Sequence, residues 1–246
     1  MPFLNGDGEV VELHLGARGE EISESNPENR FRTDWLDEVD ALLDQVVADP
    51  TRPLVITATG KFFSNGLDTD HVFAAPDQLP GYLDRVHALY AKVLTLPVPT
   101  VSAVNGHAFG AGAMLATSCD SAVMRADRGF FCLPEVVLNM PFTVGMNALM
   151  TTRLTNRVAV QAMTTGRRFG GDDAVDAVIL GQVLQADDLG GRGQQATLLH
   201  QAQGLLVELL VGLLQLGLLG LQVRLGLLEQ ARLLLQLLVG GAQFFL

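Results

Sequence analysis

The segment Asn105-Gly106-His107-Ala108-Phe109-Gly110-Ala111-Gly112-Ala113-Met114 joins two stretches of different local character. Residues 99–104 before it are apolar and favour a β-strand, and residues 113–118 after it favour a helix. Small residues at a strand-to-helix turn leave backbone N–H groups open to negative charge, on a phosphate or on a developing oxyanion. Turns of this composition also serve close packing alone in α/β folds, so a binding role needs a second feature.

A similar turn lies upstream, at Gly60-Lys61-Phe62-Phe63-Ser64-Asn65-Gly66-Leu67-Asp68. It follows residues 54–58, a strand-like run rich in β-branched side chains, and its Asn65-Gly66 pair is a strong turn signal. An ordinary loop would have the same composition. Two such turns can nevertheless point one N–H each at a shared position, where a carbonyl oxygen would be stabilised as it becomes an enolate or tetrahedral oxyanion.

A third segment, Phe131-Cys132-Leu133-Pro134-Glu135-Val136-Val137-Leu138-Asn139-Met140-Pro141, completes a pattern that resembles the crotonase (enoyl-CoA hydratase/isomerase) superfamily. The three segments are similar to F-S-x-G-x-D, N-G-x-A-x-G-x-G and P-E-x-x-L-G-x-x-P, with Asn139 at a usual glycine. The resemblance covers about residues 9–178 and looks nearest to the plant peroxisomal Δ3,Δ2-enoyl-CoA isomerases. It implies an α/β fold, with a crotonase-like ββα spiral core followed by a C-terminal helical region.

The resemblance also implies roles for individual residues. The backbone N–H groups of Leu67 and Ala111 occupy the oxyanion-hole positions, and Glu135 occupies the position of the acid/base. Apolar neighbours of Glu135 would raise its carboxyl pKa toward neutrality, as proton shuttling requires. Composition alone would instead favour a surface glutamate after a proline. The substrate-binding positions fall on Ser64, Asn65, Gly66, Asp68, Gly110, Met114 and Pro134.

Met114 is the most discriminating departure from the family pattern, because hydratases of the family carry a second glutamate there. A methionine cannot move a proton, although it can line an acyl pocket or simply pack in the helix core. One carboxyl suits the isomerisation of 3-enoyl-CoA to trans-2-enoyl-CoA, in which Glu135 carries a proton from C2 to C4. Two alternatives remain: an enoyl-CoA hydratase or other acyl-CoA lyase that uses Glu135 alone, and a non-catalytic acyl-CoA-binding relative with a defective C-terminus.

Composition narrows the choice of partners. The chain of 246 residues carries 27 acidic against 16 basic residues, and this net charge of −11 disfavours nucleic-acid binding. Its two cysteines, Cys119 and Cys132, lack metal-ligand spacing and are expected to be buried free thiols. We expect no metal and no cofactor beyond the coenzyme A of the substrate. The resemblance implies a peroxisomal protein, although residues 243–246 are not an S-K-L-type signal; otherwise we expect a cytoplasmic one.

Local patterns predict the elements of the core. Strands are expected at residues 10–15, 53–58, 100–104, 122–124 and 130–133, and helices at 34–48, 79–95, 143–154 and 156–164. Thr33 is expected to cap the first of these helices, since threonine is a favoured N-cap residue.

The chain changes character near Val178, which we take as the end of a 1–178 core and the start of an atypical 179–246 tail. The tail has no Lys, Ser, Pro, Tyr or Met, and Leu, Gln and Gly dominate it. Its longest uncharged leucine-rich run, residues 209–223, is too short for a membrane span. A divergent helical pair or an out-of-frame translation product would explain it, and we favour the latter. If the tail folds, the resemblance implies a homotrimer or homohexamer.

Overall fold

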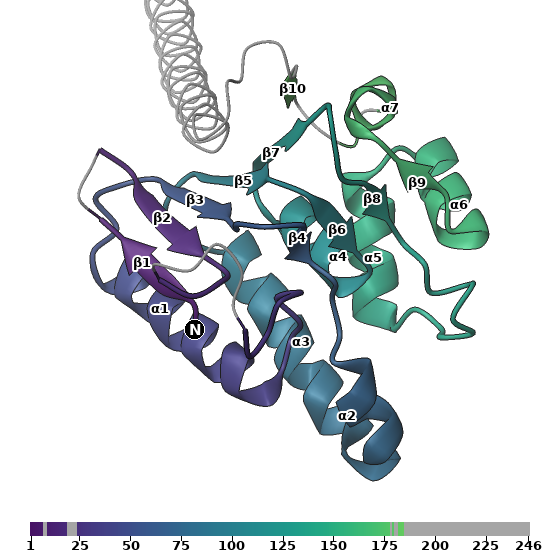
Figure 1. The fold of residues 1–246 in the computed structure, drawn as a ribbon, viewed down its shortest axis with the longest axis horizontal. Helices are drawn as coiled ribbons and strands as arrows, with labels where there is room; N and C mark the ends of the chain where they lie inside the picture. The colour runs from purple at the N-terminus through teal and green to yellow at the C-terminus, as the bar shows by residue number, and fades with distance from the viewer. Residues whose placement is uncertain (7–8, 19–23, 178, 180–181, 185–246) are drawn as a thin grey trace, which may run out of the picture. The chain divides into compact units, whose positions relative to one another are not determined.

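The computed structural model describes residues 1–6, 9–18, 24–177, 179 and 182–184, all of which belong to one compact unit. Its larger sheet has six strands in the order β1-β2-β3-β5-β7-β10 (Figure 1). The strands after β1 pair in parallel, and β1 pairs antiparallel with β2. The strand bounds are β1 Phe3–Asn5, β2 Val11–His14, β3 Leu54–Thr57, β5 Thr100–Val104, β7 Ser121–Arg125 and β10 Gln182–Leu184.

A smaller sheet of four short strands lies beside the larger one, in the order β4-β6-β8-β9 (Figure 1). Its first three strands are parallel, and β9 is antiparallel to β8. The bounds are β4 Phe62–Ser64, β6 His107–Phe109, β8 Phe131–Cys132 and β9 Arg168–Phe169. This sheet holds the three segments that the sequence singled out.

The chain builds both sheets by repeating one unit, a strand in the larger sheet, a strand in the smaller sheet and then a helix. The pairs β3–β4, β5–β6 and β7–β8 are followed by α3 (Leu79–Leu94), α4 (Ala111–Ser118) and α5 (Val144–Arg153). Parallel strands need such crossover connections. The predicted α/β fold with a ββα spiral core is therefore confirmed, whereas the predicted C-terminal helical region lies outside the described residues.

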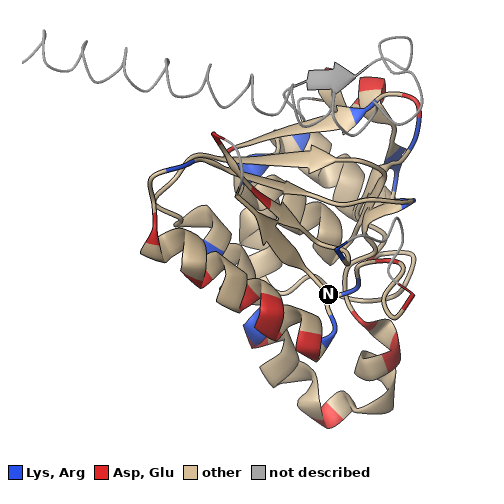
Figure 2. Cartoon of the chain, turned by 60° about the vertical axis from the view of Figure 1, so that its left-hand side comes forward, with Lys and Arg blue, Asp and Glu red and all other residues tan. Residues whose placement is uncertain are grey.

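The core explains why the central strands form. Every residue of β3 and of β5 is buried, as expected of parallel strands covered on both faces. Helix α1 (Thr33–Ala48) buries Trp35, Leu36, Val39, Leu43 and Val46 at helical spacing. Helices α1 and α3 run side by side, and the charged residues of α1 are all acidic (Figure 2). Lys92 of α3 joins them by pairing with Asp40 and Asp44, at 2.5 and 2.7 Å.

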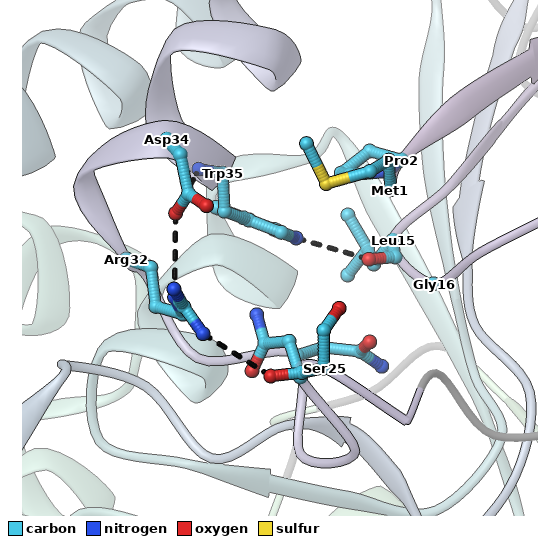
Figure 3. Close-up of a pocket in the computed structure, with 10 residues that line it drawn as sticks. Met1, Pro2, Leu15, Gly16, Ser25, Arg32, Asp34 and Trp35 are labelled. Carbon is cyan, nitrogen blue, oxygen red and sulfur yellow. Dashed lines mark hydrogen bonds and ion pairs between the residues drawn. The ribbon is translucent and has the colours of Figure 1, made fainter.

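The start of α1 differs from the prediction. Arg32, not Thr33, is the N-cap residue, and no side chain caps the helix, so the predicted Thr33 cap is wrong. Other contacts fix this end, beside a small cavity of about 40 Å³ (Figure 3). The Trp35 indole N–H donates to the carbonyl of Leu15 at 2.9 Å, and Arg32 pairs with Asp34 at 3.3 Å. One long-range hydrogen bond and one local ion pair therefore take the place of a side-chain cap.

The remaining elements are short. Helices α2 (Thr69–Ala74), α6 (Asn156–Thr165) and α7 (Gly171–Asp176) and the 3₁₀ turn Pro76–Gln78 complete the described chain. Among the described helices, none combines the length and apolarity that a membrane crossing requires. Strand β10 lies beyond the predicted boundary at residue 178 and pairs in parallel with β7. The rest of the predicted leucine-rich tail lies outside the described residues.

Candidate active site

The structure brings the two glycine-containing turns into contact. Gly66 has a φ of +82°, and a Cβ at this position would lie 2.8 Å from the nitrogen of Ala111 and 2.7 Å from the carbonyl oxygen of Phe109. Carbon atoms do not approach backbone atoms so closely, and L residues rarely adopt this φ. Only glycine therefore allows the end of β4 to lie against the start of α4.

The direction of the Leu67 N–H follows from the partner of the preceding carbonyl. The Gly66 carbonyl accepts the N–H of Phe31 at 2.8 Å. Because the peptide is planar and trans, the Leu67 N–H points the opposite way, away from Phe31. No described residue accepts a hydrogen bond from it. One donor of the first turn is thus held in a fixed direction and left available.

The Ala111 N–H is oriented by the helix that it begins. The Gly110 carbonyl accepts the N–H of Met114 at 3.0 Å, so it points along α4, and the N–H of the same peptide points out of the N-terminus. The first residue of a helix has no intrahelical acceptor for its N–H. The dipole of α4 adds partial positive charge at this point.

Glu135 lies beside the second turn. It follows β8 and Pro134, and the N–H of Met140 donates to its carbonyl at 2.9 Å. Its Oε1 lies 3.1 Å from the position that a Cβ on Gly110 would occupy, so Gly110 leaves room for the carboxyl group. Its Oε2 is buried and has no hydrogen-bond partner among the described residues. Burial raises the pKa of Glu135 to about 7, which is where a group that exchanges protons near neutral pH needs it.

A pocket of about 340 Å³ opens next to these groups. Three residues singled out from the sequence line it: Asn65, Leu67 and Pro134. Sequence reasoning did not assign the others, which are Arg30, Thr69, Phe109, Cys132, Val137, Leu138, Gly166 and Arg168. Val137 and Leu138 are largely exposed, at 68% and 52%. The pocket therefore offers an apolar wall that follows Glu135 directly in sequence.

The other residues predicted to bind substrate lie elsewhere. Ser64 is fully buried, where its hydroxyl donates to the Asn29 carbonyl at 2.7 Å and accepts the N–H of Gly66 at 3.1 Å. Met114 is also fully buried and packs in the hydrophobic core. Neither lines the described pocket. Asp68 borders a second, polar hollow of about 830 Å³, which shares Arg30 with the pocket.

Both cysteines are free and buried, as the sequence predicted. Burial raises the pKa of Cys132 to about 11 and that of Cys119 to about 12, so both remain thiols at neutral pH. The Cys132 thiol donates to the carbonyl of Gly166 at 3.3 Å. It forms part of the pocket wall without being activated.

Two strand-end turns meet beside a half-buried glutamate, on a ββα spiral. The sequence model of the enoyl-CoA hydratase/isomerase family matches residues 21–202, and the chain belongs to this family. The predicted crotonase resemblance is therefore confirmed.

The curated relatives include peroxisomal enoyl-CoA delta isomerase 2 from Arabidopsis thaliana. It is 35% identical over 158 residues, which cover 60% of this chain and 65% of the relative. The chain thus spans just under two thirds of that relative. The alpha subunit of a fatty acid oxidation complex from Pseudomonas aeruginosa is 32% identical over 210 residues, or 80% of this chain and 28% of the subunit.

Solved structures support the fold. A probable enoyl-CoA hydratase from Mycobacterium tuberculosis superposes with a TM-score of 0.71 at 22% identity, covering 83% of this chain and 81% of the other. An enoyl-CoA hydratase from Bacillus anthracis superposes with a TM-score of 0.70 at 19% identity, covering 82% and 75%. At these identities the likeness concerns the fold alone.

Proposed function

We propose that the protein isomerises 3-enoyl-CoA thioesters to trans-2-enoyl-CoA thioesters, as part of unsaturated fatty-acid β-oxidation. One observation carries the proposal: Glu135 has a buried, unpartnered oxygen and a pKa of about 7, beside two turns that meet. The names of the Arabidopsis relatives, enoyl-CoA delta isomerases 2 and 3, support the same reaction.

In the proposed reaction the Glu135 carboxylate first takes a proton from C2. The electrons of the broken C2–H bond form a C1=C2 bond, and the thioester oxygen becomes an enolate. The N–H groups of Leu67 and Ala111 stabilise that oxygen; a donor of this kind typically contributes about 10²–10³ in rate. The enolate then reforms its carbonyl, a C2=C3 bond forms, and the electrons of the former C3=C4 bond take the proton back from Glu135 at C4.

The identity of residue 114 favours isomerisation over hydration. In the family, water addition uses two cooperating carboxyl groups, whereas this chain carries Met114, whose thioether cannot transfer a proton. A hydratase or lyase that uses Glu135 alone is the competing enzyme, and a non-catalytic acyl-CoA-binding protein is the competing class.

We propose that the substrate occupies the two hollows that share Arg30 in their linings. The acyl chain would lie in the pocket along Val137 and Leu138, whose side chains are apolar and exposed. The coenzyme A portion would extend past Arg30 into the polar hollow that Asp68 and Arg32 border. Four of the binding residues proposed from the sequence would then lie along the bound substrate: Asn65, Gly66, Gly110 and Pro134. The other two, Ser64 and Met114, would pack behind them in the interior.

We propose that the reaction needs no metal and no cofactor besides the coenzyme A of the substrate, because Glu135 moves the proton and backbone N–H groups hold the charge. The names of the Arabidopsis relatives 1 and 2 motivate a peroxisomal location. A homotrimer or homohexamer is proposed from the family resemblance. Size-exclusion chromatography with light scattering and imaging of the tagged protein test these two points.

The decisive assay compares two substrates. Purified protein is given 3-hexenoyl-CoA, to follow isomerisation, and crotonyl-CoA, to follow hydration. We expect isomerisation without hydration. Glu135→Gln should lower kcat for isomerisation by about 10²–10⁴, the usual contribution of a general acid/base. The matched variant Glu24→Gln changes an exposed glutamate and should leave kcat unchanged.

Other outcomes would reject the proposal in distinct ways. Hydration without isomerisation would make the protein a hydratase. Binding of acyl-CoA without turnover of either substrate would support the non-catalytic class. Full isomerase activity in Glu135→Gln would remove Glu135 from the mechanism.

A further inference from the structure

Helix α3 carries both tyrosines of the chain, Tyr82 and Tyr90, and each places its hydroxyl on the backbone of a different turn of the candidate site. Both side chains are buried, at 3% and 4% exposure. A buried hydroxyl destabilises the fold unless it is hydrogen-bonded, whereas phenylalanine would fill the same space without that cost. The two hydroxyl groups therefore call for an explanation beyond packing.

Tyr82 holds the first turn. Its hydroxyl accepts the N–H of Asp68 at 2.9 Å and donates to the carbonyl of Phe31 at 2.8 Å. The Asp68 N–H belongs to the peptide that follows Leu67, and the peptide before Leu67 is already held through the Gly66 carbonyl and Phe31. Both peptides that flank Leu67 are thus fixed, and with them the direction of its N–H.

Tyr90 holds the second turn in the corresponding way. Its hydroxyl donates to the carbonyl of Ala111 at 3.1 Å, which belongs to the peptide that follows Ala111. The peptide before Ala111 is held through Gly110 and Met114. Each of the two N–H donors therefore has its preceding peptide fixed by backbone and its following peptide fixed by a tyrosine of the same helix.

We propose that Tyr82 and Tyr90 are positioning residues that use α3 as a common support to hold the Leu67 and Ala111 N–H groups at a set separation. The proposal rests on the function proposed above, since it assigns the two N–H groups to the enolate oxygen. Eight residues separate the tyrosines, about 12 Å along a helix, so one rigid element spans both turns. Neither tyrosine reaches the substrate in this account; each acts through the backbone that it holds.

The buried environment keeps both tyrosine hydroxyl groups protonated, so that each can donate a hydrogen bond to the backbone. Burial raises the pKa of Tyr82 and of Tyr90 above the ordinary value, and the negative charge of Glu135 raises that of Tyr90 further. Both therefore remain neutral and able to donate over the working pH range.

The test removes each hydroxyl without changing the ring, in Tyr82→Phe and Tyr90→Phe, in the full-length chain. With 3-hexenoyl-CoA, each variant should lower kcat about 10-fold, less than deletion of an oxyanion donor, while KM changes little, because the N–H groups act chiefly on the transition state. Ser102→Ala is the matched control. It removes a buried hydroxyl that donates to Ala116 at 3.0 Å, in the same helix α4 but distant from Ala111, and should leave kcat unchanged.

A spectroscopic measurement reports on the donors without turnover. Butanoyl-CoA labelled with ¹³C at the thioester carbonyl is bound to each protein, and the infrared carbonyl frequency is recorded at a temperature at which all variants are folded. The wild-type protein and Ser102→Ala should lower the frequency relative to free ligand. Each tyrosine variant should recover part of the difference.

The outcomes separate this inference from the proposed function. Tyrosine variants with unchanged kcat and an unchanged carbonyl frequency would reduce both residues to packing, with the isomerase assignment intact. A wild-type protein with neither turnover nor a carbonyl shift would reject the two-donor site itself, and this inference with it. An equal loss of kcat in Ser102→Ala would attribute the effect to general loosening of α4 and would also overturn the inference.

Discussion

The two turns of the candidate site each have one glutamate, and the two glutamates differ in every respect that matters for proton transfer. At the first turn, Glu28 accepts hydrogen bonds from Arg30 at 2.6 Å and from the Asn65 side chain at 2.9 Å. At the second turn, Glu135 has an oxygen with no partner among the described residues. The Glu28 carboxylate thus holds neighbouring side chains by hydrogen bonds, whereas the Glu135 carboxyl keeps one oxygen without a partner.

The pKa values of the two groups diverge accordingly. Burial alone would raise the pKa of Glu28, but its hydrogen bonds and the charge of Arg30 outweigh burial and lower it. For Glu135, burial outweighs a hydrogen bond from its own backbone and raises the pKa to about 7. Deeper burial and fewer hydrogen-bond partners act together to separate Glu135, which can exchange a proton near neutral pH, from Glu28, which stays ionised.

The turns also differ in which atoms an added side chain would meet at Gly66 and at Gly110. A side chain at Gly66 would meet backbone atoms of the other turn at 2.7 and 2.8 Å, whereas one at Gly110 would meet a carboxylate oxygen at 3.1 Å. Backbone atoms of a helix start cannot move aside, but a carboxylate can rotate. Of these two glycines, Gly66 is therefore the one closed in by backbone, although Gly110 also has a positive φ, of +52°.

The largest effect is expected from Gly66→Ala. The new Cβ would force the two turns apart at a φ of +82°, so we expect a loss of roughly 3–5 kcal/mol of stability together with most of the activity. Denaturant unfolding and isomerase assays measure both. Gly81→Ala is the matched control: nothing lies within 4 Å of its Cβ, and α3 should gain roughly 0.5–1 kcal/mol. Equal stability of the two variants would contradict the close approach.

A smaller effect on stability, opposite in sign to that of Gly66→Ala, is expected from Glu135→Gln. The folded pKa of about 7 lies above the ordinary 4.5, so this group favours folding fully below pH 4.5, and the benefit is lost as pH rises through 7. A shift of this size corresponds to roughly 3 kcal/mol. The neutral glutamine avoids the loss, so the variant should be the more stable protein at pH 8 and similar to wild type at pH 4.5.

Urea unfolding of both proteins at the two pH values measures the difference. If the stability of wild type and of Glu135→Gln changed equally between the two pH values, the Glu135 carboxyl would not be desolvated in the folded protein.

The smallest effect is expected from Glu28→Gln, and its sign completes the comparison. Because the folded pKa of Glu28 is lowered, its contribution is present above the ordinary pKa and is lost as pH falls through the folded value. Removing the charge should cost about 1 kcal/mol at pH 7, with little effect at pH 3. A stability gain at pH 7, like that expected for Glu135→Gln, would erase the distinction between the two carboxyls.

Sequence predicted the regular elements well where pattern and length agreed. The strand at 100–104 and the helices near 79–95 and 143–154 were found because apolar residues recur at the right spacing. In the smaller sheet, β8 fell within the strand predicted at 130–133, whereas β4, β6 and β9 were missed, since two or three residues cannot display an alternation. The predicted Thr33 cap failed because a long-range hydrogen bond of Trp35 and a local ion pair of Arg32 with Asp34 fix that helix end instead.

The candidate site could be located from sequence, but its surroundings could not. The segments around Leu67, Ala111 and Glu135 carry recognisable motifs. Tyr82 contacts Phe31 across 51 positions and Tyr90 contacts Ala111 across 21, and no local pattern encodes such pairings. The isolation of the Glu135 carboxyl likewise depends on which distant groups fail to reach it. The roles of these site residues remain predictions until they are measured.

The most direct test of the central claim follows one hydrogen atom. 3-Hexenoyl-CoA carrying deuterium at C2 is converted in ordinary water, and the product is analysed for deuterium at C4. If Glu135 alone carries the proton from a site without other hydrogen-bond partners, part of the label should appear at C4, and Glu135→Gln should abolish both label transfer and turnover. Complete loss of the label to water, with conversion unchanged in Glu135→Gln, would contradict the account.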